Sequence, residues 1–210
     1  MKVVLISSPV ASLRAKQELG PIIDNLFYNS PPLGLCYLAA VLEQNNIPVK
    51  IIDAAVENLQ FSAIIKRIRD FKADIIGMNS LTTAFYTSTE LARNIKIELK
   101  FPIIIGGPHV TANPQQTLSL KWFDIGVIGE GEEAIVDLAE ALSGKKNIQD
   151  VAGIAFRNNG NIKINHPREV IQNLDSLPFP AWDLLKGFPY QYHPAVFKYK
   201  RFPSAYIVSA

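Results

Sequence analysis

Residues 101–109 read Phe-Pro-Ile-Ile-Ile-Gly-Gly-Pro-His, and this stretch decides the fold class of the chain. Three consecutive Ile residues after a proline are typical of a short strand buried on both faces of a parallel sheet. Gly106 and Gly107 follow the strand, and glycine there permits a positive φ and lets a ligand approach the main chain closely. Open α/β sheets bind ligands at the carboxyl ends of their strands. The stretch therefore indicates either a ligand-binding edge or a tight turn.

The same unit of apolar strand, polar or glycine-containing tip and helix recurs along the chain. Strands are expected at residues 3–6, 49–52, 74–78, 103–105 and 124–128. Leucine and isoleucine recur at helical spacing between them, and Thr87, Ser88 or Thr89 is a candidate cap for the third helix. This alternation predicts an α/β fold with a five-stranded parallel sheet and helices on both faces.

The pattern changes after residue 144. Residues 153–157 and 162–165 flank Asn158-Asn159-Gly160, which is typical of a small β-hairpin. A proline-containing linker follows. We therefore divide the chain into a sheet domain at residues 1–145, a hairpin extension at 146–172, and at 173–210 a linker with the start of a further domain.

Composition excludes several classes of protein. The 210 residues are 48% hydrophobic and 19% charged with a net charge of +2, which predicts neither a nucleic-acid nor a membrane partner. Basic and aromatic residues alternate after Asp183, as in some single-strand binders, but we favour a surface that packs against another domain. One cysteine, Cys36, excludes a disulfide framework. These features suit a cytoplasmic protein.

Familiar catalytic and cofactor motifs are absent. The sequence has no GxxxxGK[ST] loop and no GxGxxG after its first strand, so Asp53 is not a credible ribose ligand. The three histidines are not spaced as metal ligands, and Ser80 and Cys36 have no neighbouring base. We therefore predict no catalytic residue and no protein metal ligand.

Three strand tips remain as a candidate binding edge. They offer hydroxyls, amides and bare backbone but little positive charge, which suits a large neutral ligand better than a polyphosphate. Alternatively, the hydroxyls of the first tip cap a helix, and Glu132 complements a helix dipole. The candidate cofactor-binding residues are Asn79, Ser80, Leu81, Thr82, Thr83, Gly106, Gly107, Pro108, His109, Gly129, Glu130, Gly131 and Glu132. We expect Gly107→Val to block binding and to leave the fold largely intact.

Four stretches resemble the cobalamin-binding domain of radical S-adenosylmethionine enzymes of the methyltransferase-like class. They are Pro-Pro-Leu-Gly-Leu at 31–35, Ile-Gly-Gly-Pro-His at 105–109, Val-Ile-Gly-Glu-Gly-Glu at 127–132 and Leu-Asp-Ser-Leu-Pro-Phe-Pro at 174–180. Together they span most of the chain. The resemblance implies a flavodoxin-like (Rossmann-like) sheet with cobalamin across the carboxyl ends of its strands. It also implies a linker into a radical barrel, in a methyltransferase or in an anaerobic oxidative cyclase of the same superfamily.

Two features depart from related cobalamin carriers. Carriers that ligate cobalt through imidazole look like Asp-x-His-x-x-Gly after the first strand, whereas residues 8–30 contain no histidine. We therefore expect no histidine ligand to cobalt from that loop, and a supporting role for His109. In the carriers, the tip after the third strand looks like Ser-x-Leu-x-Thr, whereas residues 79–83 read Asn-Ser-Leu-Thr-Thr. Contact with the nucleotide tail is then expected to move to Ser80.

The family's Cys-x-x-x-Cys-x-x-Cys motif is also missing, and one cysteine cannot hold a [4Fe-4S] cluster. We expect the cluster and S-adenosylmethionine to belong to a radical barrel domain in cis, outside these residues. The chain by itself would bind cobalamin and catalyse nothing.

Two alternatives from other classes stay open. The first is a non-enzymatic flavodoxin-like sensor of a small ligand; a receiver, however, carries acidic residues where this chain has Ser7 and Asn79. The second is a flavin or nucleotide-sugar enzyme. The missing phosphate loop after the first strand counts against that class.

Overall fold

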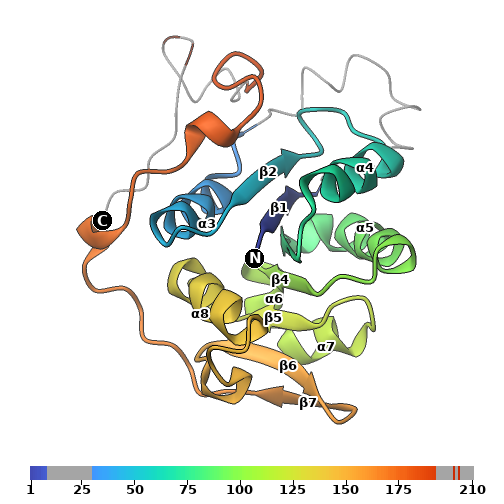
Figure 1. The fold of residues 1–210 in the computed structure, drawn as a ribbon, viewed down its shortest axis with the longest axis vertical. Helices are drawn as coiled ribbons and strands as arrows, with labels where there is room; N and C mark the ends of the chain where they lie inside the picture. The colour runs from blue at the N-terminus through green and yellow to red at the C-terminus, as the bar shows by residue number, and fades with distance from the viewer. Residues whose placement is uncertain (9–29, 193–200, 202, 204–210) are drawn as a thin grey trace.

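The computed structural model describes residues 1–8, 30–192, 201 and 203 (Figure 1). The long connection after the first strand, the basic and aromatic tail and the last expected strand lie largely or wholly outside these residues. No helix in the described part of the chain is long and apolar enough to cross a membrane.

One sheet of seven strands organises the molecule, in the order β2-β1-β3-β4-β5-β6-β7. Strands β1 to β5 pair in parallel, and their order is that of flavodoxin-like doubly wound sheets, as predicted. The strands are β1 (Val3–Ser7), β2 (Val49–Asp53), β3 (Ile75–Asn79), β4 (Ile103–Gly106), β5 (Ile125–Val127), β6 (Ile154–Asn158) and β7 (Asn161–Ile164).

The apolar strands fill two cores because successive side chains point to opposite faces of a sheet. Val3 and Leu5 pack on one face beneath the helices at residues 33–44 and 132–142, whereas Val4 and Ile6 pack on the other beneath the helices at 61–71 and 85–98. Figure 1 shows the helices on both faces. They are α3 (Leu33–Gln44), α4 (Phe61–Phe71), α5 (Phe85–Glu98), α6 (Pro108–Ala112), α7 (Pro114–Ser119) and α8 (Glu132–Leu142).

The predicted hairpin is present, and it also extends the main sheet. Strand β6 pairs antiparallel with β5, and β7 pairs antiparallel with β6. The pairing of Ile125 with Phe156 covers an edge of β5 that the five-stranded prediction left open. An uncovered edge presents unpaired backbone groups, which explains why the hairpin joins the sheet.

The expected cap of the third helix is wrong. Thr87, Ser88 and Thr89 lie inside α5, which begins at Phe85 after a 3₁₀ turn at Thr82–Ala84. Their hydroxyls donate to main-chain carbonyls, those of Thr87 and Ser88 to Ala84 at 2.9 Å and that of Thr89 to Phe85 at 2.8 Å. The helix therefore begins about one turn earlier than the apolar spacing indicated.

The segment after the hairpin returns past α8 to α3 (Figure 1). The Ala181 N–H donates to the Cys36 carbonyl at 3.1 Å. Tyr192 is fully buried, and the rings of Trp182 and Phe188 stack with centroids 4.9 Å apart. Residues 181–192 are thus anchored in the same core as α3.

Candidate functional site

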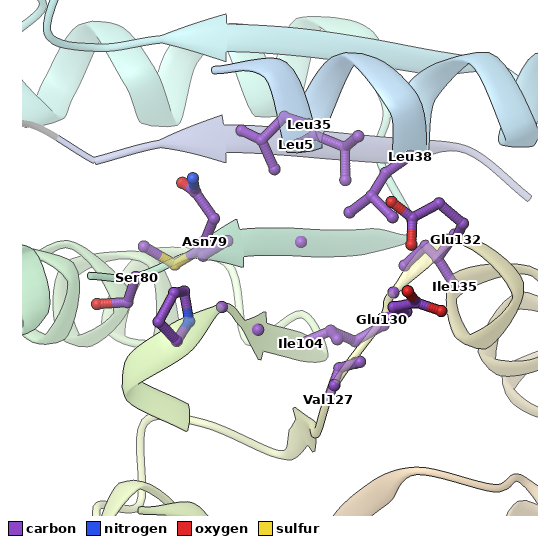
Figure 2. A pocket seen from close by; sticks show the side chains of 18 of the residues that line it. Leu5, Leu35, Leu38, Asn79, Ser80, Ile104, Val127, Glu130, Glu132 and Ile135 are labelled. Atoms are coloured by element: carbon purple, nitrogen blue, oxygen red, sulfur yellow. The ribbon is translucent and has the colours of Figure 1, made fainter. Parts of the chain in front are cut away.

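A cavity of about 440 Å³ lies between the sheet, α3 and α8. Figure 2 shows Leu5, Leu35 and Leu38 on one side of it, and Ile104 and Val127 on the opposite side. Its volume is within the range of small-molecule and cofactor sites. The cavity reaches the carboxyl ends of β3, β4 and β5, where the sequence placed the candidate edge.

Most of the predicted site residues line this cavity, and three do not. Those that line it are Asn79, Ser80, Leu81, Gly106, Gly107, Pro108, Gly129, Glu130, Gly131 and Glu132. Thr82, Thr83 and His109 lie outside the lining.

The tip after β3 presents an amide and conceals its first hydroxyl. The Ser80 side chain is buried, and its Oγ donates to the Leu81 carbonyl at 3.0 Å. The Ser88 hydroxyl lies 3.4 Å from the Ser80 Oγ. The Asn79 amide borders the cavity in Figure 2. Among the described residues the Asn79 amide has no hydrogen-bond partner, so Asn79, rather than Ser80 as expected, presents a polar group to the cavity.

The two glycines after β4 have different roles. A Cβ on Gly106 would meet only Val127, at an ordinary 3.5 Å. Gly107 has a φ of 103°, and a Cβ there would stand 2.8 Å from the Ser80 carbonyl oxygen. Gly107 is thus required by the close approach of two main chains, so the expected tolerance of Gly107→Val is contradicted.

The tip after β5 is held by neighbouring segments. The Gly129 N–H donates to the Thr111 hydroxyl at 3.0 Å. A Glu130 carboxylate oxygen accepts the Ile171 N–H at 2.7 Å. Burial raises the pKa of Glu132 above its ordinary value, against opposing hydrogen bonds from the first backbone amides of α8. These carboxyl groups therefore shape one end of the cavity.

A strap of residues 168–171 after the hairpin closes part of the cavity wall. Arg168 donates to Glu133 at 2.9 Å and forms a second ion pair with Asp137, both on α8. Its Nε is buried with no partner among the described residues. The strap is thereby fastened to the helix that borders the cavity.

Most residues of the apolar wall, and all residues of the strap, were not predicted from the sequence. The missed lining residues are Leu5, Gly34, Leu35, Leu38, Gly77, Met78, Ile104, Val127, Ile135, Arg168, Glu169 and Val170. Gly34 and Leu35 belong to a stretch already quoted for its family resemblance, so that signal was available. The strap reaches the cavity through contacts between residues that are distant in the sequence. No local sequence pattern indicates such contacts.

His109 faces the core behind the tips. Its ring stacks on Phe85 with centroids 3.8 Å apart, and its Nδ1 lies 3.3 Å from the Thr82 hydroxyl oxygen. Its Nε2 is buried without a partner in the described part of the chain. The supporting role expected for His109 agrees with this position. Within the described ranges, no three His, Cys, Asp or Glu side chains are grouped as a metal site.

The fold is flavodoxin-like, with a cavity at the carboxyl edge of its sheet. The B12 binding domain family matches residues 20–139, which is more than half of the chain, and the chain belongs to that family.

Two curated relatives and one solved structure are similar to this chain over most of its length. The chain is 38% identical over 189 residues to the uncharacterized methyltransferase PH0819 of Pyrococcus horikoshii, covering 88% of this chain and 39% of that protein. It is 26% identical over 170 residues to the anaerobic magnesium-protoporphyrin IX monomethyl ester cyclase of Cereibacter sphaeroides, covering 78% and 28%. The cobalamin-dependent S-adenosylmethionine radical enzyme OxsB has the same fold, with a TM-score of 0.72 and 21% identity over 87% of this chain and 24% of that one. The chain thus spans about two fifths or less of each of these three proteins.

Proposed function

We propose that this chain binds cobalamin, with the nucleotide tail in the cavity and the corrin ring across the strand tips. The carrying observation is the open apolar cavity at the carboxyl edge of the sheet, in a chain of the B12 binding domain family. Cobalamin joins a broad corrin ring to a tail that ends in a bicyclic aromatic base. A cavity of about 440 Å³ has room for the base and its sugar, and too little for the ring.

The residues that line the cavity and its mouth fit both the nucleotide tail and the corrin ring of such a ligand. Leucine and isoleucine side chains from the sheet and α3 supply dry contact for an aromatic base. At the rim of the cavity, Gly106 has no side chain, Pro108 is part of the lining, and Leu81 is 50% exposed. A flat macrocycle edged with neutral amides needs apolar surface and main-chain hydrogen bonds, and this rim offers both.

The cobalt ion is proposed to have no histidine ligand from the first loop. Residues 8–30 contain no histidine. His109 is buried against Phe85 rather than directed to the rim. We therefore assign His109 to support of the β3 tip through Thr82.

In the whole protein we propose methyl transfer, together with a radical S-adenosylmethionine domain that holds a [4Fe-4S] cluster. Bound cobalamin supplies a carrier for the methyl group. The residues described here bind and orient that carrier. Support comes from the methyltransferase relative, which is more similar at 38% identity than the cyclase relative at 26%. Oxidative cyclisation is the second candidate, favoured by the cyclase match over 78% of the chain.

The division of the chain stays part of the proposal. We assign cobalamin binding to residues 1–145, a wall of the site to the hairpin extension at 146–172, and the connection to the radical domain to residues 173–210. The strap at 168–171 supports the second assignment because it borders the cavity.

The test is retention of hydroxocobalamin. The purified chain is incubated with it and desalted, and the visible spectrum is recorded. We expect stoichiometric corrin absorbance. Gly34→Leu is expected to abolish retention, because Gly34 lines the cavity and a Cβ there meets no atom within 4 Å. The fold should tolerate this leucine, which also removes a glycine from a helix.

The matched control is Ser62→Leu. Gly34 and Ser62 are each the second residue of their helices, α3 and α4, and α4 covers the opposite face of the sheet. Ser62 is exposed, so this leucine leaves the cavity unchanged. Absence of corrin absorbance in the folded parent chain would favour the alternative of a sensor for another small ligand.

A further inference from the structure

The cavity has apolar side walls, and its labelled polar side chains lie at its two ends (Figure 2). Leu5, Leu35 and Leu38 face Ile104 and Val127 across it (Figure 2). A ring bound between these walls has to be accepted without hydrogen bonds to them. Burying a polar group without a partner is unfavourable. The walls therefore discriminate against a ring with several donors and acceptors.

The polar side chains at the ends of the cavity are mostly engaged within the protein. Ser80 donates to the Leu81 carbonyl, and Glu130 accepts the Ile171 N–H. Arg168 is paired with two carboxylates of α8. Glu132 lies at the start of the same helix, and burial raises the pKa of its carboxyl group.

The Arg168 Nε, in the lining of the cavity, is buried without a partner in the described part of the chain. The Asn79 amide also has no hydrogen-bond partner among the described residues, and it borders the cavity. One amide satisfies one, or at most two, polar atoms of a bound ring. Asn79 thus offers a partner for one ring nitrogen at its end of the cavity, whereas further donors and acceptors of a ring that face the apolar side walls stay unpaired.

Natural cobamides differ in the base that ends their nucleotide tail. A benzimidazole has one free ring nitrogen, whereas adenine has an amino group and two further ring nitrogens. We propose that this cavity selects cobamides with a benzimidazole base over cobamides with adenine. The proposal rests on the proposed function, because it requires the tail to enter the cavity.

The expected discrimination is about tenfold or more. Asn79 can pair with one polar atom of adenine, which leaves the amino group or a ring nitrogen buried against leucine and isoleucine. A buried polar group left without a partner costs about 1–3 kcal/mol in protein sites, which is about 5- to 150-fold in affinity. The methyl groups of dimethylbenzimidazole add apolar contact on the same walls.

The experiment is an absorbance titration of the purified chain with three corrinoids: cobalamin, adeninylcobamide and cobinamide, which lacks the nucleotide tail. We expect cobalamin to bind about tenfold or more tightly than adeninylcobamide, and cobinamide to bind more weakly than cobalamin. Equal affinity for cobalamin and adeninylcobamide would overturn the selectivity while leaving cobalamin binding intact. Equal affinity for cobinamide would overturn it as well, because the tail would then lie outside the cavity. Failure of all three to bind would overturn the proposed function itself.

Leu38→Asn tests whether the wall formed by α3 discriminates between the two bases. It places a second amide at the cavity, so adeninylcobamide is expected to gain on cobalamin by about threefold or more. Ile97→Asn is the matched control, because Ile97 is exposed on α5, outside the cavity. An unchanged affinity ratio in a folded Leu38→Asn variant that still binds cobalamin would overturn the assignment of selectivity to this wall. A shift of the same size in Ile97→Asn would do so too.

Discussion

Gly107 lies directly against the main chain of Ser80: a Cβ on Gly107 would stand 2.8 Å from the Ser80 carbonyl oxygen and 3.1 Å from its nitrogen. Two hydrogen bonds fasten the same two tips. The Ser80 N–H donates to the Gly106 carbonyl at 2.9 Å, and the His109 N–H donates to the Ser80 carbonyl at 3.4 Å. The rim of the cavity is therefore a joint between the ends of β3 and β4.

Gly107→Ala is expected to destabilise the protein by about 2–4 kcal/mol. The substitution places a side chain at a φ of 103° and drives its Cβ into the Ser80 backbone. Urea unfolding followed by circular dichroism measures the change. Gly106→Ala is the control, because its Cβ meets only Val127 at 3.5 Å and should change stability by less than about 1 kcal/mol. Equal stability of the two variants would contradict the close packing of Gly107 against the Ser80 main chain.

Asp53 gives the fold a specific pH dependence. Burial raises the pKa of Asp53 to about 6, although backbone N–H groups of Val56 and Ala55 act in the opposite direction. The folded state thus holds this proton more tightly than the unfolded chain, whose aspartate pKa is about 3.9. The stability from Asp53 is fully present below pH ~4 and falls as the pH rises from about 4 to about 6, by about 3 kcal/mol.

The measurement compares the free energy of unfolding of the parent chain and Asp53→Asn at pH 4 and pH 7. An amide cannot ionise, so the free energy of unfolding of the variant should increase relative to that of the parent as the pH rises across this window. A difference between the two proteins that is the same at both pH values would rule out Asp53 as its origin.

Cys36 is expected to be unreactive in the folded protein. Burial raises the pKa of its thiol to about 12, and the charges of Asp53 and Asp183 add to the effect. The thiolate is the form that reacts with disulfides and alkylating agents. Ellman's reagent at pH 8 should therefore label the thiol in denaturant and leave it largely unmodified in the native state. Rapid native labelling would show that residues 181–192 do not cover it.

The sequence revealed the parallel strands because β1, β3 and β4 are buried runs with no polar interruption. It located the strand tips for the same reason, since each apolar run ends in glycine, serine or asparagine. It did not show that the hairpin pairs with β5, because strand pairing depends on contacts distant in sequence. The sequence also did not distinguish the roles of Gly106 and Gly107. These roles depend on the backbone conformation of each glycine and on the atoms that lie next to it in the folded chain.

The strap at residues 168–171 supplies the last prediction, because its attachment to α8 is electrostatic. Burial acts to raise the pKa of Asp137, but hydrogen bonds from Lys146 and Arg168 outweigh it and hold that pKa below its ordinary value. Arg168→Gln removes the bonds to Asp137 and Glu133, so the Ile171 amide should exchange its hydrogen faster and cobalamin should bind more weakly. Lys163→Gln is the charge-matched control, because the contact of Lys163 with Gln149 is exposed and neither residue lines the cavity. Faster exchange at Ile171 with unchanged cobalamin affinity would show that the strap is fastened by Arg168 but is no part of the binding wall.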